Sequence, residues 1–164
     1  MSAFETAFET TTCSRCCGSG KYSFNLIHGS RCYGCGGSGK VLTKRGKAAQ
    51  KWFRDAISRP AREVPVGWLV WWPDVSAMGK SKWVTVADSS EPHQIGTSGN
   101  GEPLMVVDFI TMSGSKCGVS PDTLVRAVES IAQRDAVLQQ AIAYQETLNP
   151  NTGKPAKRTT GAAA

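Results

Sequence analysis

The feature that most constrains this chain is a pattern that occurs twice near its N-terminus, Cys-x-x-Cys-x-Gly-x-Gly. The first copy covers residues 13–20 and the second covers residues 32–39. Two such pairs supply the four thiolates that one tetrahedral Zn²⁺ ion requires. The glycines permit turns with positive φ, which direct backbone N–H groups at the thiolates. We therefore predict one zinc site, whose ligands are Cys13, Cys16, Cys32 and Cys35.

Other roles for these cysteines fit the sequence less well. Residues 1–6 lack the basic start and apolar segment of a secretory signal, so we expect a reducing cytosol, which favours zinc over disulfides. A thioredoxin-type redox pair needs a βαβ unit, and none is predicted around either pair, which leaves redox chemistry a minor alternative. Residues 34–40 are similar to a phosphate-binding loop, but Val41 stands where a magnesium-binding Ser or Thr is needed. Nucleotide hydrolysis is dismissed on that basis.

Two cysteines and both histidines remain outside the predicted site. Cys17 adjoins a ligand and could replace it, but the register of the motif favours Cys16. Cys117 lies among strand-like residues, where a free cysteine is more often a small buried side chain than a nucleophile. His28 and His93 are out of register with the cysteine pairs, so no metal role is predicted for them.

Positive charge is concentrated near the N-terminus. The 164-residue chain has a net charge of +6, and residues 1–62 alone hold eleven lysines and arginines against three acidic residues. This asymmetry predicts an anionic partner, either nucleic acid or an acidic protein surface. The longest apolar run, residues 68–72, is far too short to cross a membrane, so a soluble protein without a membrane partner is expected.

The order of the expected elements indicates an α+β fold. It consists of a small zinc-stapled β-hairpin with a helix, then a small antiparallel SH3-like β-barrel, then a C-terminal helix. The chain divides into an N-terminal arm, a zinc-binding module with a basic helix, a β domain, a C-terminal helix and a disordered tail. These segments cover residues 1–12, 13–60, 63–128, 129–148 and 149–164.

A helix is predicted over residues 44–58, with Thr43 as its N-cap. Apolar residues recur every three or four positions between Ala48 and Ile57, which predicts one buried stripe. Basic residues follow the same spacing on another side: Lys44, Lys47, Lys51 and Arg54. These four are the candidate residues for binding nucleic acid or a partner, and the alternative is a solvated face that keeps the protein soluble.

Strand-like runs follow the helix, at residues 64–72, 81–87, 104–110 and 116–119. The first run, Val-x-Val-Gly-x-x-Val-Trp, is similar to the opening strand of small SH3-like barrels. Alternation places Trp68 and Trp72 on one face of this strand and Trp71 on the other, with Trp83 on the next strand. One set of aromatic side chains must fill the core. The other set is either structural or a binding patch.

The C-terminal part begins with the features of a helix entry at residues 120–122, which predicts a helix as far as Leu148 with an optional break near Ala127. Apolar residues at steps of three or four predict one stripe, formed by Leu124, Val128, Ile131, Leu138 and Ile142. The stripe either docks on the sheet, which we prefer, or pairs with a second subunit as a homo-oligomer. Beyond Pro150 the composition predicts disorder.

The two motif copies resemble the cysteine-rich domain of DnaJ-type chaperones, in which four such units bind two zinc ions. This chain has two copies and no His-Pro-Asp signature of a J-domain, so the resemblance implies one zinc ion and does not imply activation of an Hsp70 partner. Residues 32–57 are also similar to the anti-TRAP family of single-zinc proteins, which have two cysteine pairs and a helix after a Leu-Thr-x-x-Gly step. The chain also looks like small zinc-finger proteins of bacteriophages. These resemblances imply a module that grips another macromolecule.

The leading hypothesis is a non-enzymatic zinc-binding protein that docks on a protein partner, with a regulatory role in a bacterial cytoplasm or in the host cytoplasm of a phage. Four thiolates leave no open position at the metal for an activated water, and the sequence contains no evident Ser/His/Asp set or paired catalytic carboxylates. One alternative is nucleic-acid binding through the basic helix. Another is a chaperone-like or thiol-disulfide activity.

Overall fold

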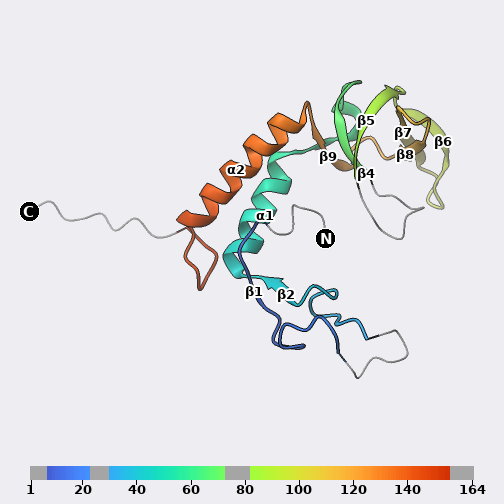
Figure 1. Ribbon diagram of the computed structural model, residues 1–164. Coiled ribbons are helices and arrows are strands. Elements are labelled where there is room, and N and C mark those ends of the chain that lie inside the picture. Colours follow the sequence, from blue (N-terminus) through green and yellow to red (C-terminus); the bar gives the residue numbers. More distant parts are fainter. Residues whose placement is uncertain (1–6, 23–29, 73–81, 156–164) are drawn as a thin grey trace, which may run out of the picture. The chain divides into compact units, whose positions relative to one another are not determined.

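The fold is that of a computed structural model, which describes residues 7–22, 30–72 and 82–155 (Figure 1). It is an α+β fold with two α-helices and antiparallel strands in the described residues. The chain forms two compact units, one from residues 1–53 and 139–164 and one from residues 54–138. This grouping does not test the five segments predicted from the sequence. Neither described helix has the length and apolar character needed to span a bilayer.

A short antiparallel ribbon connects the two sides of the cysteine region in the first unit. Strand β1 (Thr10–Thr12) pairs with strand β2 (Lys40–Leu42). The end of the predicted N-terminal arm is therefore part of a sheet.

Helix α1 (Lys44–Ala56) follows β2, close to the predicted bounds. The predicted cap is present, because the Gly46 N–H donates a hydrogen bond to Thr43 Oγ1 at 3.1 Å. Ala49 and Phe53 are buried, as the predicted stripe requires. The Phe53 ring lies 6.2 Å from the ring of Phe8, which connects the helix to the segment before β1.

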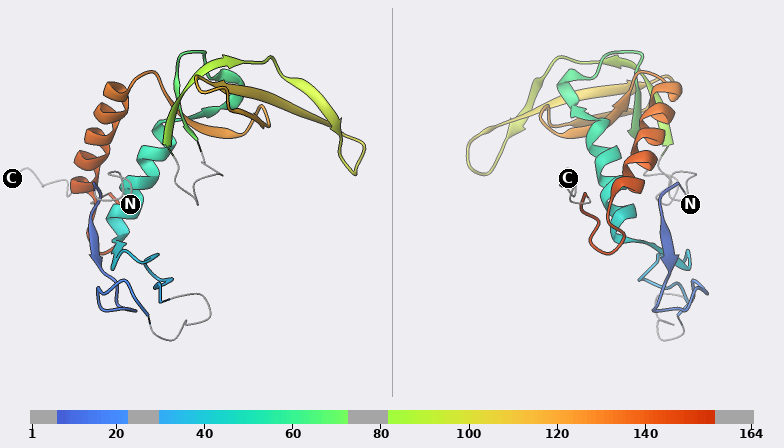
Figure 2. Two further views of the ribbon diagram at one scale, coloured as in Figure 1. Left: turned by 45° about the vertical axis from the view of Figure 1, so that its right-hand side comes forward. Right: turned by 90° about the vertical axis from the view of Figure 1, so that its left-hand side faces the viewer.

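Helix α2 (Ile131–Thr147) contributes its second half to the first unit, where it lies beside α1 (Figures 1 and 2). Tyr144 stacks on Trp52 with ring centres 5.7 Å apart, and Ala141 is fully buried. The predicted apolar stripe is wrong, because Ile131 is 43% exposed and the buried positions begin at Ala141. Residues 149–155, predicted to be disordered, form a turn in which the Gly153 N–H donates to the Asn149 carbonyl at 2.8 Å.

Glu9 connects β1 to both helices of the first unit. Arg45 donates two hydrogen bonds of 2.6 Å to its carboxylate, and the Thr43 hydroxyl donates a third at 2.5 Å. The Glu9 backbone N–H donates to Gln145 Oε1 on α2 at 2.8 Å. Arg45 and then Thr43 lower the pKa of Glu9 to about 2, so the carboxylate is ionised at neutral pH.

Gly46 permits the close approach of β1 to α1. A Cβ at this helical position would lie 2.3 Å from the Glu9 carbonyl oxygen. Helix propensity favours alanine over glycine by about 1 kcal/mol, whereas forcing two backbone segments apart costs on the order of 1–3 kcal/mol or more. We therefore expect Gly46→Ala to lower the free energy of unfolding by up to about 2 kcal/mol, as measured by urea denaturation.

The control for this prediction also introduces alanine, at the neighbouring exposed position of the helix. Lys47→Ala leaves only a methyl side chain on α1 where the native side chain is exposed, so it should leave stability unchanged within about 0.5 kcal/mol. If Gly46→Ala raised the free energy of unfolding, the close contact with Glu9 would not limit the side chain that this position tolerates.

The second unit contains one antiparallel sheet, whose strand order is β3-β9-β4-β5-β7-β6, with β8 also paired to β7. The strands are β3 (Ser58–Pro60), β4 (Leu69–Trp72), β5 (Lys82–Ser89), β6 (His93–Thr97), β7 (Pro103–Thr111), β8 (Lys116–Val119) and β9 (Leu124–Val128). A 3-10 turn, η2, covers Ala61–Glu63. Each of the four predicted strand runs overlaps one of these strands (β4, β5, β7 and β8), whereas β3, β6 and β9 were not predicted.

The sheet is open. Among the described strands no pairing joins β3 at one end to β6 at the other, so the SH3-like barrel is not confirmed. The pairing register shifts between Val86 and Asp88 and again between Gln94 and Gly96. Such irregularities bend strands, and the β6–β7 hairpin projects from the rest of the sheet (Figure 2).

The prediction of a helix from residue 120 is wrong for residues 124–128, which form β9. This strand lies between β3 and β4 and buries Ala127 and Val128. Its β-branched residues suit a strand, and pairing on both sides outweighs the helix-entry signal that precedes it. The helix starts later, after Ser130, whose hydroxyl accepts a hydrogen bond from the Gln133 N–H at 3.1 Å.

The core of the second unit lies on one face of this sheet. Its buried members are Ala61, Val64, Val70, Val86, Val107, Phe109 and Ala127. Trp68 and Trp72 pack against them, which confirms the face predicted from alternation along β4. Trp71 lies on the opposite face, where its ring centre is 5.4 Å from that of Trp83.

Candidate metal centre

The four predicted ligands come together in the first unit. The sulfur atoms of Cys13, Cys16, Cys32 and Cys35 all lie within 4.8 Å of one another. The Sγ atoms of Cys13 and Cys32 are 4.0 Å apart, and those of Cys16 and Cys35 are 3.7 Å apart. Four sulfurs at 2.3 Å from a tetrahedral ion would be about 3.8 Å apart. The cluster therefore has the size and the donor set that one tetrahedral metal ion requires.

The two motif copies are related by pseudo-symmetry, in which equivalent residues are 19 positions apart in sequence. The Cys13 N–H donates to the Gly39 carbonyl at 2.8 Å, and the Cys32 N–H donates to the Gly20 carbonyl at 2.9 Å. We call the first motif copy (residues 13–20) the first knuckle and the second copy (residues 32–39) the second knuckle. The residue pairs beside the two knuckles repeat with the same offset: Thr12 with Lys40, and Arg31 with Lys21. Each copy thus holds the other in place, which a single copy could not do.

Each knuckle directs a backbone N–H group at a sulfur. The Gly20 N–H lies 3.3 Å from Cys16 Sγ, and the Gly39 N–H lies 3.2 Å from Cys35 Sγ. Such donors stabilise a thiolate over a thiol. The trailing glycines of the motif are therefore part of the site, as the sequence predicted.

The serine found in both copies stabilises the turn of its own knuckle by hydrogen bonds to the backbone. The Ser19 hydroxyl donates to the Cys16 carbonyl at 2.7 Å, and the Ser38 hydroxyl donates to the Cys35 carbonyl at the same distance. Each hydroxyl also accepts a backbone N–H two residues later, at 3.3 Å. The sequence contains this repeated serine, but its role follows only from these bonds.

Burial and hydrogen bonding give the cysteine thiols different acidities. Cys32 is completely buried, and burial raises the pKa of its thiol to about 11. Burial also acts to raise the pKa of Cys35, but N–H groups of Gly39 and Gly37 outweigh it and lower the pKa to about 6. Cys32 therefore needs a bound cation to ionise at neutral pH, and metal binding would release its proton.

Cys17 does not belong to the cluster, which agrees with the register of the motif. It is exposed, and it is the only non-glycine residue with positive φ in the described part of the chain, at 49°. Gly36 occupies the equivalent position in the second copy, with φ of 58°. This conformation costs an L-residue about 1–2 kcal/mol.

We expect Cys17→Gly to be more stable than Cys17→Ala by about 1 kcal/mol, because only glycine adopts this conformation without strain. Both variants should bind as much metal as the wild type, since neither changes the cluster. Urea denaturation and elemental analysis measure the two effects. Metal loss in either variant would instead make Cys17 a ligand.

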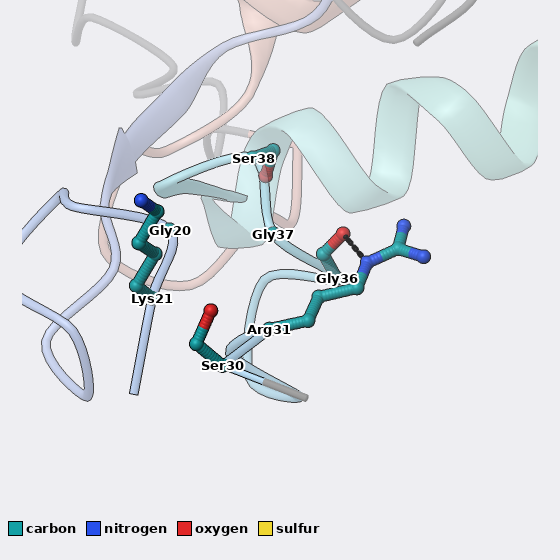
Figure 3. Close-up of a pocket in the computed structure, with 7 residues that line it drawn as sticks. All are labelled: Gly20, Lys21, Ser30, Arg31, Gly36, Gly37 and Ser38. Carbon is teal, nitrogen blue, oxygen red and sulfur yellow. Dashed lines mark hydrogen bonds between the residues drawn. The ribbon is translucent and has the colours of Figure 1, made fainter. Parts of the chain in front are cut away.

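Arg31 supports the second knuckle. Its Nε donates to the Gly36 carbonyl at 2.5 Å, and its side chain passes beside Gly37 (Figure 3). Tyr22 and Val41, which also differ by 19 positions, pack against the buried cysteines. The apolar cover of the site is thus as symmetric as its hydrogen bonds.

The four predicted binding cations lie on α1. All of them are exposed: Lys44, Lys47, Lys51 and Arg54. Arg45, between them in sequence, is instead bound to Glu9. Contact with a partner through these cations stays a prediction.

A polar cluster in the second unit was not found by sequence analysis. Asp108, which is 8% exposed, lies with Oδ2 2.8 Å from Lys116 Nζ and 3.4 Å from His93 Nε2. His93 Nδ1 is 3.3 Å from Ser90 Oγ, so a Ser, a His and an Asp do meet here. The Ser90 hydroxyl already accepts the Asp108 N–H at 2.9 Å. We interpret the cluster as a structural tie, because these bonds join β7 to β8 and to the bend before β6.

No protein-family model, curated protein or solved structure matches this chain. The resemblance to DnaJ-type and anti-TRAP proteins therefore rests on the two motif copies themselves. Fold and site together define an α+β protein with a four-cysteine cluster that can hold one metal ion.

Proposed function

We propose that this chain is a non-enzymatic zinc-binding protein whose knuckle module docks on a protein partner. The observation that carries the proposal is the four-sulfur cluster, with separations close to those of a tetrahedral thiolate site. Zn²⁺ prefers this geometry and this donor set. Four protein ligands leave no position for a reacting water, so the ion has a structural role.

The metal is central because little else stabilises the knuckles. Among the described residues, the apolar side chains that pack against this cluster, apart from the cysteines, are those of Tyr22 and Val41. Such a small apolar core cannot offset the entropy of ordering two glycine-rich loops. Comparable structural zinc ions supply on the order of 10 kcal/mol to folding.

The exposed surface of the second knuckle supports docking on a protein. Tyr33 lies between the two ligands of that knuckle and is 56% exposed. Tyrosines presented on a rigid element are typical anchors of protein interfaces, since they bury a large area and lose little side-chain entropy. The neighbouring knuckle contributes Arg15, whose guanidinium lies 4.8 Å from the Tyr22 ring centre.

Two measurements on the full chain test this function. Elemental analysis should find one zinc per chain, and its absence would overturn the proposal. Capture of partners from a bacterial lysate should be lost on chelation and in Tyr33→Ala, while Tyr33→Ala keeps its zinc. The matched control is Met112→Ala, which truncates a side chain that is 76% exposed in the second unit. Equal capture by wild type and Tyr33→Ala would remove Tyr33 from the interface.

Nucleic-acid binding through α1 is the second candidate function, favoured by the exposure of all four predicted cations along one helix. Binding of this kind weakens steeply as salt rises, because counterions are released from the phosphates. The double variant Lys47→Ala/Lys51→Ala should give a shallower salt dependence. Salt-insensitive binding, or no binding to DNA and RNA, would exclude this candidate.

A further inference from the structure

A row of four side chains crosses the sheet of the second unit on the face opposite its core. Ser58 is opposite Arg126 in the β3–β9 pair, and Trp71 is opposite Trp83 in the β4–β5 pair. Arg126 joins the two pairs, because its Cζ lies 5.2 Å from the centre of the Trp71 ring. Both indoles are partly exposed. The row therefore presents a cation and two aromatic rings at one surface.

Arg126 has no counter-ion in the described part of the chain: none of the ion pairs found there involves it. Burial and the positive charge of Arg54 lower its pKa. Arg54 precedes β3 on the chain, and the Ser58 hydroxyl donates to the Arg54 carbonyl at 2.7 Å. A partly buried cation beside a like charge is unfavourable, and a bound anion would relieve that repulsion.

We propose that this face binds single-stranded nucleic acid, with a backbone phosphate at Arg126 and bases stacked on Trp71 and Trp83. The guanidinium already lies on an indole, so it loses little freedom when it accepts a phosphate. Indole rings stack on any base, which makes such a surface tolerant of sequence. This inference goes beyond the proposed function and does not depend on the metal.

The combination of groups favours a nucleic acid over an acidic peptide. Carboxylates could pair with Arg126, but an acidic side chain has no flat ring for the two indoles. Single strands offer phosphates and unstacked bases together, whereas a duplex keeps its bases stacked inside. Alternation of cations with aromatic rings is the usual character of single-strand binding surfaces.

The test uses the full zinc-loaded chain and fluorescein-labelled single strands of fifteen thymidines or uridines, followed by anisotropy over a series of salt concentrations. Arg126→Gln should weaken binding about tenfold and reduce the salt slope by about 0.7, the value for one phosphate contact. Trp83→Leu should weaken binding about tenfold or more with little change of slope, because it removes stacking only. Arg126→Lys should restore the slope, since it keeps the charge.

The matched control is Lys82→Gln, which removes one positive charge next to Trp83 but, by strand alternation, from the other face. It should change affinity less than twofold, and thermal melts verify that every variant is folded. No binding by the wild type at low salt, or equal losses in Lys82→Gln and Arg126→Gln, would overturn the proposal. Tighter binding of polyglutamate or of a duplex than of the single strands would overturn it in favour of another ligand. None of these outcomes changes the zinc content, so they leave the proposed function separately testable.

Discussion

Cys32→Ser is expected to abolish metal binding and to unfold the knuckle region of the first unit. The Cys32 side chain is completely buried, with its sulfur 4.0 Å from that of Cys13. A serine hydroxyl is a poor zinc ligand at neutral pH, and its burial without a partner is itself costly. Loss of the metal removes a contribution on the order of 10 kcal/mol, more than the total stability of many small domains. Elemental analysis, circular dichroism and urea denaturation measure the result.

The matched control for this experiment is Cys17→Ser, the same exchange at an exposed cysteine outside the cluster. It should keep one metal ion per chain and the wild-type unfolding midpoint. Chelation of the wild type should reproduce the effect of Cys32→Ser, because both remove the same ion. A Cys32→Ser protein with full zinc content and an unchanged circular dichroism spectrum would show that the cluster does not depend on this ligand.

Gly39→Ala is expected to be among the most damaging substitutions outside the ligands themselves. Gly39 has φ of +75°, and a Cβ on it would lie 2.2 Å from the Gly18 carbonyl oxygen. Both groups are backbone, so no side-chain movement relieves the overlap, and the two knuckles must separate. Positive φ and overpacking together should cost at least about 3 kcal/mol. Because every 1.4 kcal/mol is a factor of ten, zinc affinity should fall about a hundredfold.

Gly36→Ala distinguishes the two contributions to the cost of Gly39→Ala, which are the positive φ and the overlap with backbone. Gly36 also has positive φ, +58°, but the nearest atom to a Cβ there is 3.8 Å away, at the end of the Arg31 side chain. This variant should lose only about 1 kcal/mol, the cost of the left-handed conformation. A competition titration with a chromophoric zinc chelator measures both affinities. Equal losses in Gly36→Ala and Gly39→Ala would mean that close approach of the knuckles does not govern metal binding.

Local patterns predicted the metal cluster and its helix well. Cys13 and Cys32 lead two copies of one motif, and a repeated motif with fixed spacing contains most of the geometry of its site. Thr43 caps α1 as predicted, because capping depends on residues within one turn. Strict alternation along β4 predicted the core face of Trp68 and Trp72 for the same reason.

Predictions that needed long-range pairing failed or could not be made. Residues 124–128 carry apolar spacing that also suits a helix, and only pairing with β3 and β4 makes them a strand. The barrel was not confirmed, because the register shifts along β5 and β6 are not visible in the sequence. Residues far apart in sequence, such as Asp108 and Ser90, meet only after β7 has been placed beside β5.

The four-cysteine cluster of this chain was thus readable from two short segments, since each knuckle is built from consecutive residues whose turns are encoded locally. The contacts of Glu9 with Gln145 and of Arg126 with Trp71 depend on tertiary structure, because each joins segments brought together by strand pairing or helix packing. Local chemistry decides which residues can hold a metal. Packing of distant segments decides which charges and aromatic rings share a surface. The binding face that we propose on the second unit depends on such packing.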